Sequence, residues 1–556
     1  MKKGLRLLVS LLITLLFAGI GYYIFLPPLN IFAEEFWVML AVLAIVFNVV
    51  YWLLGWKEIK KDKSSSSGFK NPFKIGFRSD GKQFRAVRIA VIVVPIAVLI
   101  VGSVLSASFF HADAYANIIQ VKEAVFEEDM PETDLVTNIA LTDSQTASII
   151  GARKLGYLSE VVSQYEVNGT YYQINYNKTP QKVSCLEYAD FFRWFNNRKK
   201  GIPGYIMVDT VNSSAEYNEF PTAVRYTDSA YFSDDLNRKL RFEYPTKIFG
   251  SYSFEVDDSG NPFYIVSCMK PKVGLFGAKD VSEVIIFNPV DGSSALYSLD
   301  QVPSWVDNVY TGTLASQKYD WHGTLQNGFW NSIFGKKDCK VTTDDYGYIV
   351  LDDDVWFFTG VTSVVSDESN IGFIISNART GEYKFYSVIG AEEYSAMGSA
   401  QGQVQEKGYT ASFPALINVS GEATYIMTLK DAESLVRMYA LVNVENYRIV
   451  AIGDSQTEAK QAYIKKLQNE GVLTPEDIEL PAAKTAEITV SDLRFFVVGG
   501  ESMAYITGSD GFLYKQTISS DESLVLLQTG ERITVEYADG AHEKIRQIIS
   551  WKRTEQ

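Results

Sequence analysis

The sequence predicts three transmembrane α-helices followed by a large α+β extracytoplasmic region, which has repeated β-hairpin modules and a C-terminal small β-barrel of the OB or SH3 type. Three observations lead to this prediction. The first 110 residues contain three long runs without a charged side chain. Residues beyond 200 are rich in short β-patterned runs that polar turns separate. Such runs follow one another most closely at 485–556.

The three apolar runs cover about residues 7–26, 36–56 and 89–110, and each is long enough to cross a hydrocarbon core of about 30 Å. With the loop at 57–88 they form a membrane domain over residues 1–110. The loop carries ten basic and three acidic residues. Because loops rich in Lys and Arg stay in the cytoplasm, we expect a multi-pass protein of the cell membrane with a cytoplasmic N-terminus and an extracytoplasmic C-terminal region.

Two alternatives for processing stay open. In one, the first apolar run is a cleaved signal peptide, although no small-residue cleavage site follows it. In the other, cleavage after Ala114 or Ala116 releases the region beyond the third run, because Ala-x-Ala patterns lie there. The sequence does not decide between these alternatives and an intact chain.

The charges divide the chain into a basic and an acidic part. Residues 1–88 carry a net charge of +8, and the remainder carries −23. An acidic outer region argues against nucleic acid as a partner, because binding to phosphates needs clustered Lys and Arg. The expected partner is the lipid bilayer, and envelope proteins or further copies of the chain stay open as others.

Cysteine and histidine are scarce. Cys185, Cys268 and Cys339 are too far apart in sequence for a CxxC redox motif or a zinc ribbon, and one disulfide among them stays open. The chain has three histidines, which leaves little for a histidine-based metal site. We therefore predict no metal site and no cofactor.

The region beyond the membrane domain divides into three predicted parts. A juxtamembrane α+β segment covers 111–180, a repeat-like α+β region covers 181–480, and a β-barrel covers 485–556. The barrel prediction rests on five or six short alternating runs, among them Leu524–Leu527.

Helices are predicted in both of the first two parts, and helical spacing is also present near Asp143–Tyr165. Amphipathic spacing predicts a helix over Ala116–Phe126. Ser184–Gly201 has the strongest helix signal of the chain, because Ser184 and Glu187 form a capping box and basic residues occupy the last turn.

One pattern of strand, polar turn and strand recurs at intervals of roughly 70 to 90 residues. Its copies begin near Tyr205, Val284, Phe373 and Tyr439. In the middle two, Asn opens the turn and Gly closes it, and these residues favour a hairpin. This Asn-x-x-[Asp/Thr]-Gly hairpin resembles that of PepSY-type extracytoplasmic modules over about ten residues, too short a stretch to assign the chain to that family. We expect similar α+β modules.

A hydrolase-like motif has a simpler explanation. The Gly-Asp-Ser sequence that ends at Ser455 resembles the nucleophile block of GDSL-type hydrolases, and Asp539 and His542 match their D-x-x-H spacing. That family keeps its triad in one α/β domain, whereas this pair falls in the predicted barrel. Ser455 and Glu458 also form a capping box, which explains the motif as a helix start. We therefore predict no catalytic residue.

Acidic residues gather at Asp344–Asp345 and Asp352–Asp354. Their oxygen atoms are ligands of the kind that calcium prefers. The spacing lacks the D-x-D-x-D-G loop, however, and Asp352–Asp354 is typical of a solvated hairpin turn between two strands. We expect a turn here, with a structural calcium site as the alternative.

The best candidate for a binding site is the stretch 319–331. Asp320, Trp321 and His322 combine a carboxylate, an indole and an imidazole, and Trp330 adds a second indole. Such side chains suit acid–base chemistry or stacking on a sugar. The alternative is a segment packed under aromatic side chains with a hydrogen-bonded histidine. We take these four residues as the predicted binding residues.

The expected function is that of a membrane-anchored scaffold, assembly or binding protein of the bacterial cell envelope, without enzymatic activity. Few ionisable groups lie in the apolar runs, which argues against a transporter. An extracytoplasmic hydrolase or carbohydrate-active enzyme is the first alternative, and a ligand sensor is the second. An enzyme requires a cleft with convergent polar groups, whereas a scaffold exposes an apolar patch.

Overall fold

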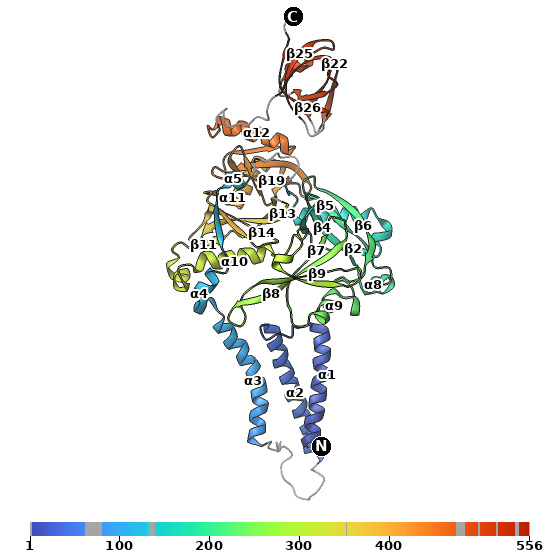
Figure 1. Cartoon of the computed structure of the whole chain (residues 1–556), viewed down its shortest axis with the longest axis vertical. Coiled ribbons are helices and arrows are strands. Elements are labelled where there is room, and N and C mark those ends of the chain that lie inside the picture. The colour runs from blue at the N-terminus through green and yellow to red at the C-terminus, as the bar shows by residue number, and fades with distance from the viewer. Residues whose placement is uncertain are drawn as a thin grey trace.

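Three helices stand at one end of the molecule, a large β-rich body lies in the middle, and a small barrel lies at the far end (Figure 1). This computed structural model describes residues 3–61, 81–130, 132, 139–351, 353–473, 484–498, 501–518, 521–539 and 544–554.

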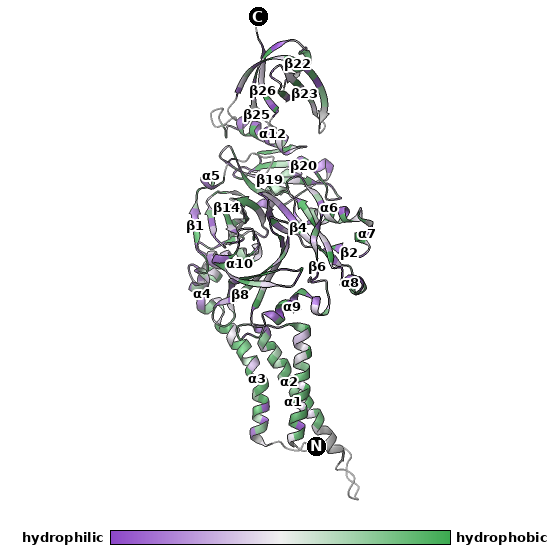
Figure 2. Ribbon diagram, turned by 45° about the vertical axis from the view of Figure 1, so that its right-hand side comes forward, coloured by the Kyte–Doolittle hydropathy of each residue, from purple (hydrophilic) through white to green (hydrophobic). Residues whose placement is uncertain are grey.

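The three N-terminal helices are α1 (Lys3–Phe25), α2 (Glu34–Lys61) and α3 (Lys82–Leu105). Each is long and apolar enough to cross a membrane. Hydrophobic residues predominate along the three helices below the β-rich body (Figure 2). The prediction of three apolar helices that can span a membrane is therefore confirmed.

The basic ends of the three helices meet at the end farthest from the β-rich body. Arg6 donates through Nε to the backbone oxygen of Tyr51 at 2.6 Å, and its guanidinium lies 3.8 Å from the centre of the Tyr51 ring. The Arg88 guanidinium lies 4.4 Å from the same ring centre. The basic ends and the β-rich body are therefore on opposite sides of the apolar segment.

The β-rich body is attached to the third helix through Ser106. This residue follows α3, is 3% exposed, and accepts through Oγ from the backbone amides of Leu275 at 2.8 Å and Phe276 at 3.0 Å. Tyr115, on the short helix α4 (Ser108–Ala116), donates to the backbone oxygen of Ser106 at 2.7 Å. One hydroxyl thus accepts from two amides at the junction, a buried one at Phe276 and a partly buried one at Leu275.

The predicted helix over Ala116–Phe126 is wrong. Helix α4 ends at Ala116, and β1 (Val121–Ala124) then pairs in parallel with β15 (Tyr383–Tyr386). The short helix α5 (Phe126–Asp129) follows. Backbone pairing with a distant strand outweighs the helical spacing, as tertiary context often does in short segments.

Four sheets make up the body, and their strands pair antiparallel except for β1 with β15. Sheet one contains β2 (Tyr165–Val167), β3 (Tyr172–Tyr176), β4 (Thr179–Tyr188), β5 (Ile202–Asp209) and β6 (Ser214–Val224). Sheet two contains β7 (Ile248–Val256), β8 (Pro262–Val273), β9 (Gly277–Phe287) and β10 (Ser294–Ser298). Strand β4 contains residue 180, which is the predicted boundary between the juxtamembrane segment and the repeat-like region.

Sheets three and four follow in the chain. Sheet three contains β1, β11 (Lys340–Thr342), β12 (Gly347–Leu351), β13 (Asp354–Ser363), β14 (Ser366–Asn377), β15 and β16 (Gly390–Ala391). Sheet four contains β17 (Thr410–Ala411), β18 (Ala415–Val419), β19 (Glu422–Lys430), β20 (Val436–Asn443) and β21 (Val450–Gly453).

Each sheet contains four strands that are consecutive in the chain and paired in order. These meanders are β3 to β6, β7 to β10, β12 to β15, and β18 to β21. The segments predicted to form hairpins are the last two strands of each meander. Each sheet of the body is thus built on one four-stranded antiparallel meander.

The sheets pack in pairs. Val183 and Ile206 of sheet one share a buried core with Phe254 of sheet two. Phe373 of sheet three shares another with Tyr425 of sheet four. The remaining helices of the body are α6 (Ser144–Gly156), α7 (Ser159–Val162), α8 (Phe191–Asn197), α9 (Leu236–Glu243), α10 (Gly312–Leu325), α11 (Glu393–Gln403) and α12 (Gln456–Asn469). Helices also pack on the sheets: α10 shares a buried core with sheet three, and α12 shares one with sheet four.

The prediction of a helix over Ser184–Gly201 is wrong in its first half. Ser184 and Glu187 belong to β4, and the Ser184 hydroxyl donates to the backbone oxygen of Asn168 at 2.7 Å. Helix α8 begins only after Asp190, whose carboxylate accepts from the amides of the first turn at 2.9 Å. Pairing of β4 with β5 provides backbone hydrogen bonds that the capping box does not outweigh.

The C-terminal segment is a closed barrel of five strands. They are β22 (Lys484–Val498), β23 (Glu501–Gly508), β24 (Leu513–Thr517), β25 (Arg532–Asp539) and β26 (Ile545–Arg553). The predicted small barrel is confirmed, but the predicted strand Leu524–Leu527 is wrong. Residues Glu522–Leu526 form a 3-10 helix, which places Leu524 inside the barrel core.

Replacing Ser106 by valine is expected to lower the free energy of unfolding by about 2 kcal/mol, because the amides of Leu275 and Phe276 lose their acceptor. Ser103→Val is the matched control, since Ser103 is exposed on the same helix. Thermal unfolding of the full-length chain in detergent measures both. Equal stability of the two variants would contradict the role of Ser106 at the junction.

Candidate functional site

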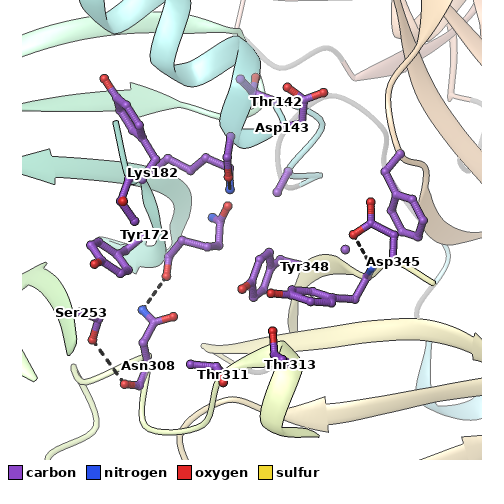
Figure 3. Close-up of a pocket in the computed structure, with 18 of the residues that line it drawn as sticks. Thr142, Asp143, Tyr172, Lys182, Ser253, Asn308, Thr311, Thr313, Asp345 and Tyr348 are labelled. Carbon is purple, nitrogen blue, oxygen red and sulfur yellow. Dashed lines mark hydrogen bonds between the residues drawn. The ribbon is translucent and has the colours of Figure 1, made fainter. Parts of the chain in front are cut away.

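A cavity of about 510 Å³ lies where the four sheets meet (Figure 3). The first strand of each meander contributes to its wall: Tyr172 from β3, Ser253 from β7, Tyr348 from β12 and Ala415 from β18. The cavity is therefore in contact with all four sheets.

Lys182 is the distinctive residue of the cavity. It extends from β4 into the space between the sheets and is 4% exposed (Figure 3). Its ammonium donates to the Ser144 hydroxyl at 3.3 Å and lies 5.4 Å from the centre of the Tyr348 ring. Within the described part of the chain, Lys182 forms no ion pair with a carboxylate. Burial lowers the pKa of Lys182 to about 8, and the charge of Asp143 opposes this shift.

The Asp143 carboxylate, whose charge acts on Lys182, already has two partners within the protein. Its carboxylate caps α6 by accepting from the Thr146 amide at 2.7 Å, and it pairs with Lys430 of β19 at 2.5 Å. Burial raises the pKa of Asp143, but the hydrogen bonds from Lys430 and Thr146 outweigh it and lower the pKa overall. The charge of Asp143 is thus compensated by Lys430, which leaves Lys182 without a carboxylate of its own.

Aromatic rings and hydroxyl groups form most of the remaining wall. Tyr172 and Tyr348 stand on opposite sides of the space in Figure 3. Hydroxyl groups come from Thr142, Ser144, Ser251, Ser253, Thr311 and Thr313. Tyrosine faces stack on apolar faces of a ligand, and hydroxyls both donate and accept hydrogen bonds.

Two side-chain amides also line the cavity. Gln173 is 2% exposed and donates through Nε2 to the Gln181 backbone oxygen at 3.1 Å, but its Oε1 has no hydrogen-bond partner. Asn308 donates to the Gln173 backbone oxygen at 2.8 Å (Figure 3). A buried acceptor without a donor costs free energy, which a ligand with a hydroxyl group would recover.

A buried pair of carboxyl groups holds Asn308 in place. Glu255 of β7 has no exposed surface and accepts from the amides of Asp307 and Asn308, both at 2.9 Å. Asp307 in turn accepts from the Asn175 amide of β3 at 2.7 Å. Burial raises the pKa of Asp307 well above its usual range, and the nearby charge of Glu255 raises it further.

Two helix N-termini point toward the cavity. Ser144 is the first residue of α6, and Thr311 caps α10 by accepting from the Leu314 amide at 3.2 Å. Helix N-termini carry partial positive charge. Together with the Lys182 ammonium they favour an anionic group in the cavity, whereas Asp345 on the opposite wall offers an acceptor for ligand hydroxyls (Figure 3).

Three of the four predicted binding residues lie on α10, away from this cavity. The Asp320 carboxylate accepts from the Thr342 amide at 2.8 Å. Trp321 packs edge-to-face on Tyr115 with ring centres 5.0 Å apart. His322 lies with Nδ1 2.7 Å from the Ala116 backbone oxygen. Each side chain thus has a partner within the protein, and a binding role for these residues stays a prediction.

Trp330 lies in a different environment, beside the end of the third helix. It is 61% exposed, packs edge-to-face on Phe109 at 5.5 Å and stacks on Phe334 at 5.7 Å between ring centres. Phe110 and Phe334 are exposed as well. The structure therefore does not bring Trp330 together with His322, and places it instead in an aromatic patch made of Phe109, Phe110, Trp330 and Phe334.

The acidic residues considered for calcium have separate partners. Asp354 pairs with Arg379 at 2.7 Å, and Asp353 accepts from the side chain of Asn175 at 2.7 Å. Asp345 lines the central cavity, and Asp352 lies outside the described residues. Within the described ranges no three acidic, histidine or cysteine side chains are grouped as metal ligands.

The Gly-Asp-Ser motif begins a helix, as predicted. Ser455 accepts from the Glu458 amide at 3.2 Å, and Glu458 accepts from the Asp454 amide at 2.8 Å, which completes the capping box of α12. His542 lies outside the described residues. Cys185, Cys268 and Cys339 are buried free thiols, so they form no disulfide with one another.

No protein-family model matches the chain, and no curated protein matches it. Among solved structures, the chain matches an α-L-arabinofuranosidase from Lactobacillus brevis at 8% identity, over 67% of this chain and 90% of that one, with a TM-score of 0.16. It matches a levansucrase variant from B. megaterium at 9% identity, over 78% and 96%, with a TM-score of 0.16. At TM-scores this low the likeness carries no argument about fold or function.

Replacing Asp307 by asparagine is expected to make the stability less dependent on pH. In the unfolded chain the Asp307 carboxyl group loses its proton near pH 3.9. In the folded chain its pKa is higher, so the free energy of unfolding falls as the pH rises from the unfolded pKa to the folded pKa. The asparagine still accepts from the Asn175 amide and cannot ionise. Melting temperatures of the full-length chain from about pH 4 to pH 8 test this.

The control for this experiment is Asp300→Asn, because Asp300 is exposed. It should follow the pH profile of the unchanged protein. A profile of Asp307→Asn that coincides with that of the control would show that Asp307 does not hold a proton in the folded state.

Proposed function

We propose that this chain is a membrane-anchored, non-enzymatic binding protein of the bacterial cell envelope, and that its central cavity binds a small hydroxylated anion of the acidic-sugar class. The single observation that carries the proposal is Lys182, a buried ammonium that faces the cavity without a carboxylate partner. Burying an unpaired charge is costly, and an anionic ligand would offset that cost.

The rest of the wall selects the class of anion. A sugar carboxylate fits the Lys182 ammonium, and sugar hydroxyls fit the serine and threonine side chains. Tyr172 and Tyr348 offer faces for the apolar side of a pyranose ring. The cavity volume of about 510 Å³ falls within the usual range for small-molecule sites.

Carbohydrate hydrolysis is the alternative, and Asp143 argues against it. Glycosidases need a carboxyl group that keeps its proton and donates it to the leaving group. Asp143 lines the cavity, but its pKa is lowered by the partners that also fix it in place. Binding without turnover therefore agrees better with the electrostatics of this cavity.

We propose that the three apolar helices cross the membrane with the basic loop in the cytoplasm and the β-rich body outside. The opposite placement of basic ends and body supports this orientation. The aromatic patch beside α3 supports it too, because exposed indole and phenyl rings favour the membrane–water boundary. The lipid bilayer is then the partner of the helices and of this patch.

We also propose that the four sheets are copies of one module. Each meander ends on a hairpin, and in sheets two and three that hairpin turns through Asn-x-x-x-Gly. Gly292 and Gly381 both have a positive φ there, which glycine adopts without strain.

Lys182→Met is expected to weaken binding of D-glucuronate at least about tenfold, because a charge-assisted hydrogen bond is lost while the aliphatic stem stays. Isothermal titration of the full-length chain in detergent measures this, with D-glucose as the uncharged comparison. Lys270→Met is the control variant, since Lys270 is exposed on β8 outside the cavity. Equal affinity for both sugars, absence of glucuronate binding, or an unchanged Lys182→Met variant would refute the proposal.

The orientation predicts that an epitope tag within 57–88 is protected from antibody in intact cells, and that a tag after Gln556 is accessible. Permeabilised cells, in which both tags should react, serve as the control. The reverse accessibility in intact cells would overturn the topology.

A further inference from the structure

A second cavity, of about 840 Å³, lies between α1 and α2 directly below the β-rich body. We call it the helix groove. Apolar side chains such as Ile24, Val38 and Val42 line its length, and Gly21 leaves its wall open. Arg241 of α9 and Phe249 of β7 close it at the end nearest the body. The groove therefore continues from an apolar region into one that holds a cation.

Arg241 is buried at that end with incomplete hydrogen bonding. It is 5% exposed, and its Nη1 donates to the backbone oxygen of Lys247 at 2.6 Å. The guanidinium stacks on Phe249 at 4.0 Å from the ring centre. Its Nε, however, is buried and has no hydrogen-bond partner among the residues that the structure describes. A buried guanidinium with a free donor is a site for an acceptor oxygen, and phosphate oxygens suit it well.

Acidic residues stand at the same end of the groove. Glu34 and Glu35 begin α2 and line the groove there. Glu34 pairs with Lys279 of the body at 3.4 Å, whereas Glu35 is exposed. Arg241 and Glu35 therefore offer opposite charges at one end of an apolar groove. This arrangement matches a lipid head group that carries both a phosphate and an ammonium group.

We infer that the helix groove binds one phospholipid, with its phosphate against Arg241 and an acyl chain between α1 and α2. This inference goes beyond the proposed sugar site and depends only on the three helices crossing a bilayer. The outward faces of α1 and α2 are exposed apolar surfaces, so the medium that reaches the groove is the hydrocarbon of the membrane. In a phosphoethanolamine head group the phosphate pairs with Arg241 and the ammonium pairs with Glu35.

Gly21 provides a direct test. A Cβ atom added at Gly21 meets no atom within 4 Å, and Gly21 lines the groove, so a leucine introduced there is expected to extend into the groove. Gly19, two residues earlier on α1, also has open space around it but does not line the groove. Gly19→Leu is therefore matched to Gly21→Leu in helix propensity and in added apolar surface.

The experiment is native mass spectrometry of the full-length chain after delipidation and incubation with dioleoylphosphatidylethanolamine. The unchanged chain and Gly19→Leu are expected to carry one bound lipid, and Gly21→Leu is expected to bind at least about tenfold more weakly. With dioleoylglycerol, which lacks the phosphate, the unchanged chain should bind more weakly by a similar factor. Arg241→Gln should lose that difference between the two lipids.

Three results would overturn the inference. They are equal lipid binding by both glycine variants, no preference for the phosphate-bearing lipid, and a dimer mass in place of bound lipid, which would mean that a second copy occupies the groove. Thermal unfolding of each variant shows whether it remains folded. Because glucuronate binding is measured separately, failure of the lipid site and failure of the sugar site are distinguishable.

Discussion

Glu255 is a carboxylate without exposed surface, and four donors converge on it: two backbone amides, the Asn308 side chain and the Ser253 hydroxyl. These bonds fix the connection between β10 and α10 against β7. Asp307 and Asn308 then reach the backbone of β3, so one buried carboxylate joins sheets one and two. Desolvation of Glu255 is costly, and its full set of donors offsets that cost.

Similar buried polar contacts join the other neighbouring sheets. The amides of Val309 and Tyr310 donate to the Ala378 backbone oxygen beside sheet three, and Tyr425 of sheet four accepts from Asn370 of sheet three. Lys430 of sheet four pairs with Asp143 next to sheet one, which completes the ring. In this ring Asp143 and Glu255 accept from partners within the protein, whereas Lys182 forms no ion pair among the described residues. The site is thus a consequence of how the sheets are joined.

The sequence was sufficient for features that depend on local pattern. Apolar length defined the three helices, alternation defined the barrel, and the capping box of Ser455 located α12. It was misleading at Ser184–Gly201 and Ala116–Phe126, because pairing with distant strands decides those segments. The cavity could not be predicted from the sequence for the same reason. Nothing local in the sequence distinguishes Lys182 from other lysines, because its burial depends on four sheets that are joined by contacts distant in sequence.

The proposed site depends on Lys182 as a buried ammonium that has no carboxylate partner within the described ranges. The most direct test is an NMR titration of the lysine ε-carbon signals in the full-length chain, with Lys182 assigned through Lys182→Arg. Our account predicts a pKa of about 8 for Lys182, and a higher value once an acidic sugar is bound. A pKa near 10.4, as in an exposed lysine, would mean that water or a carboxylate reaches the ammonium and would contradict the account.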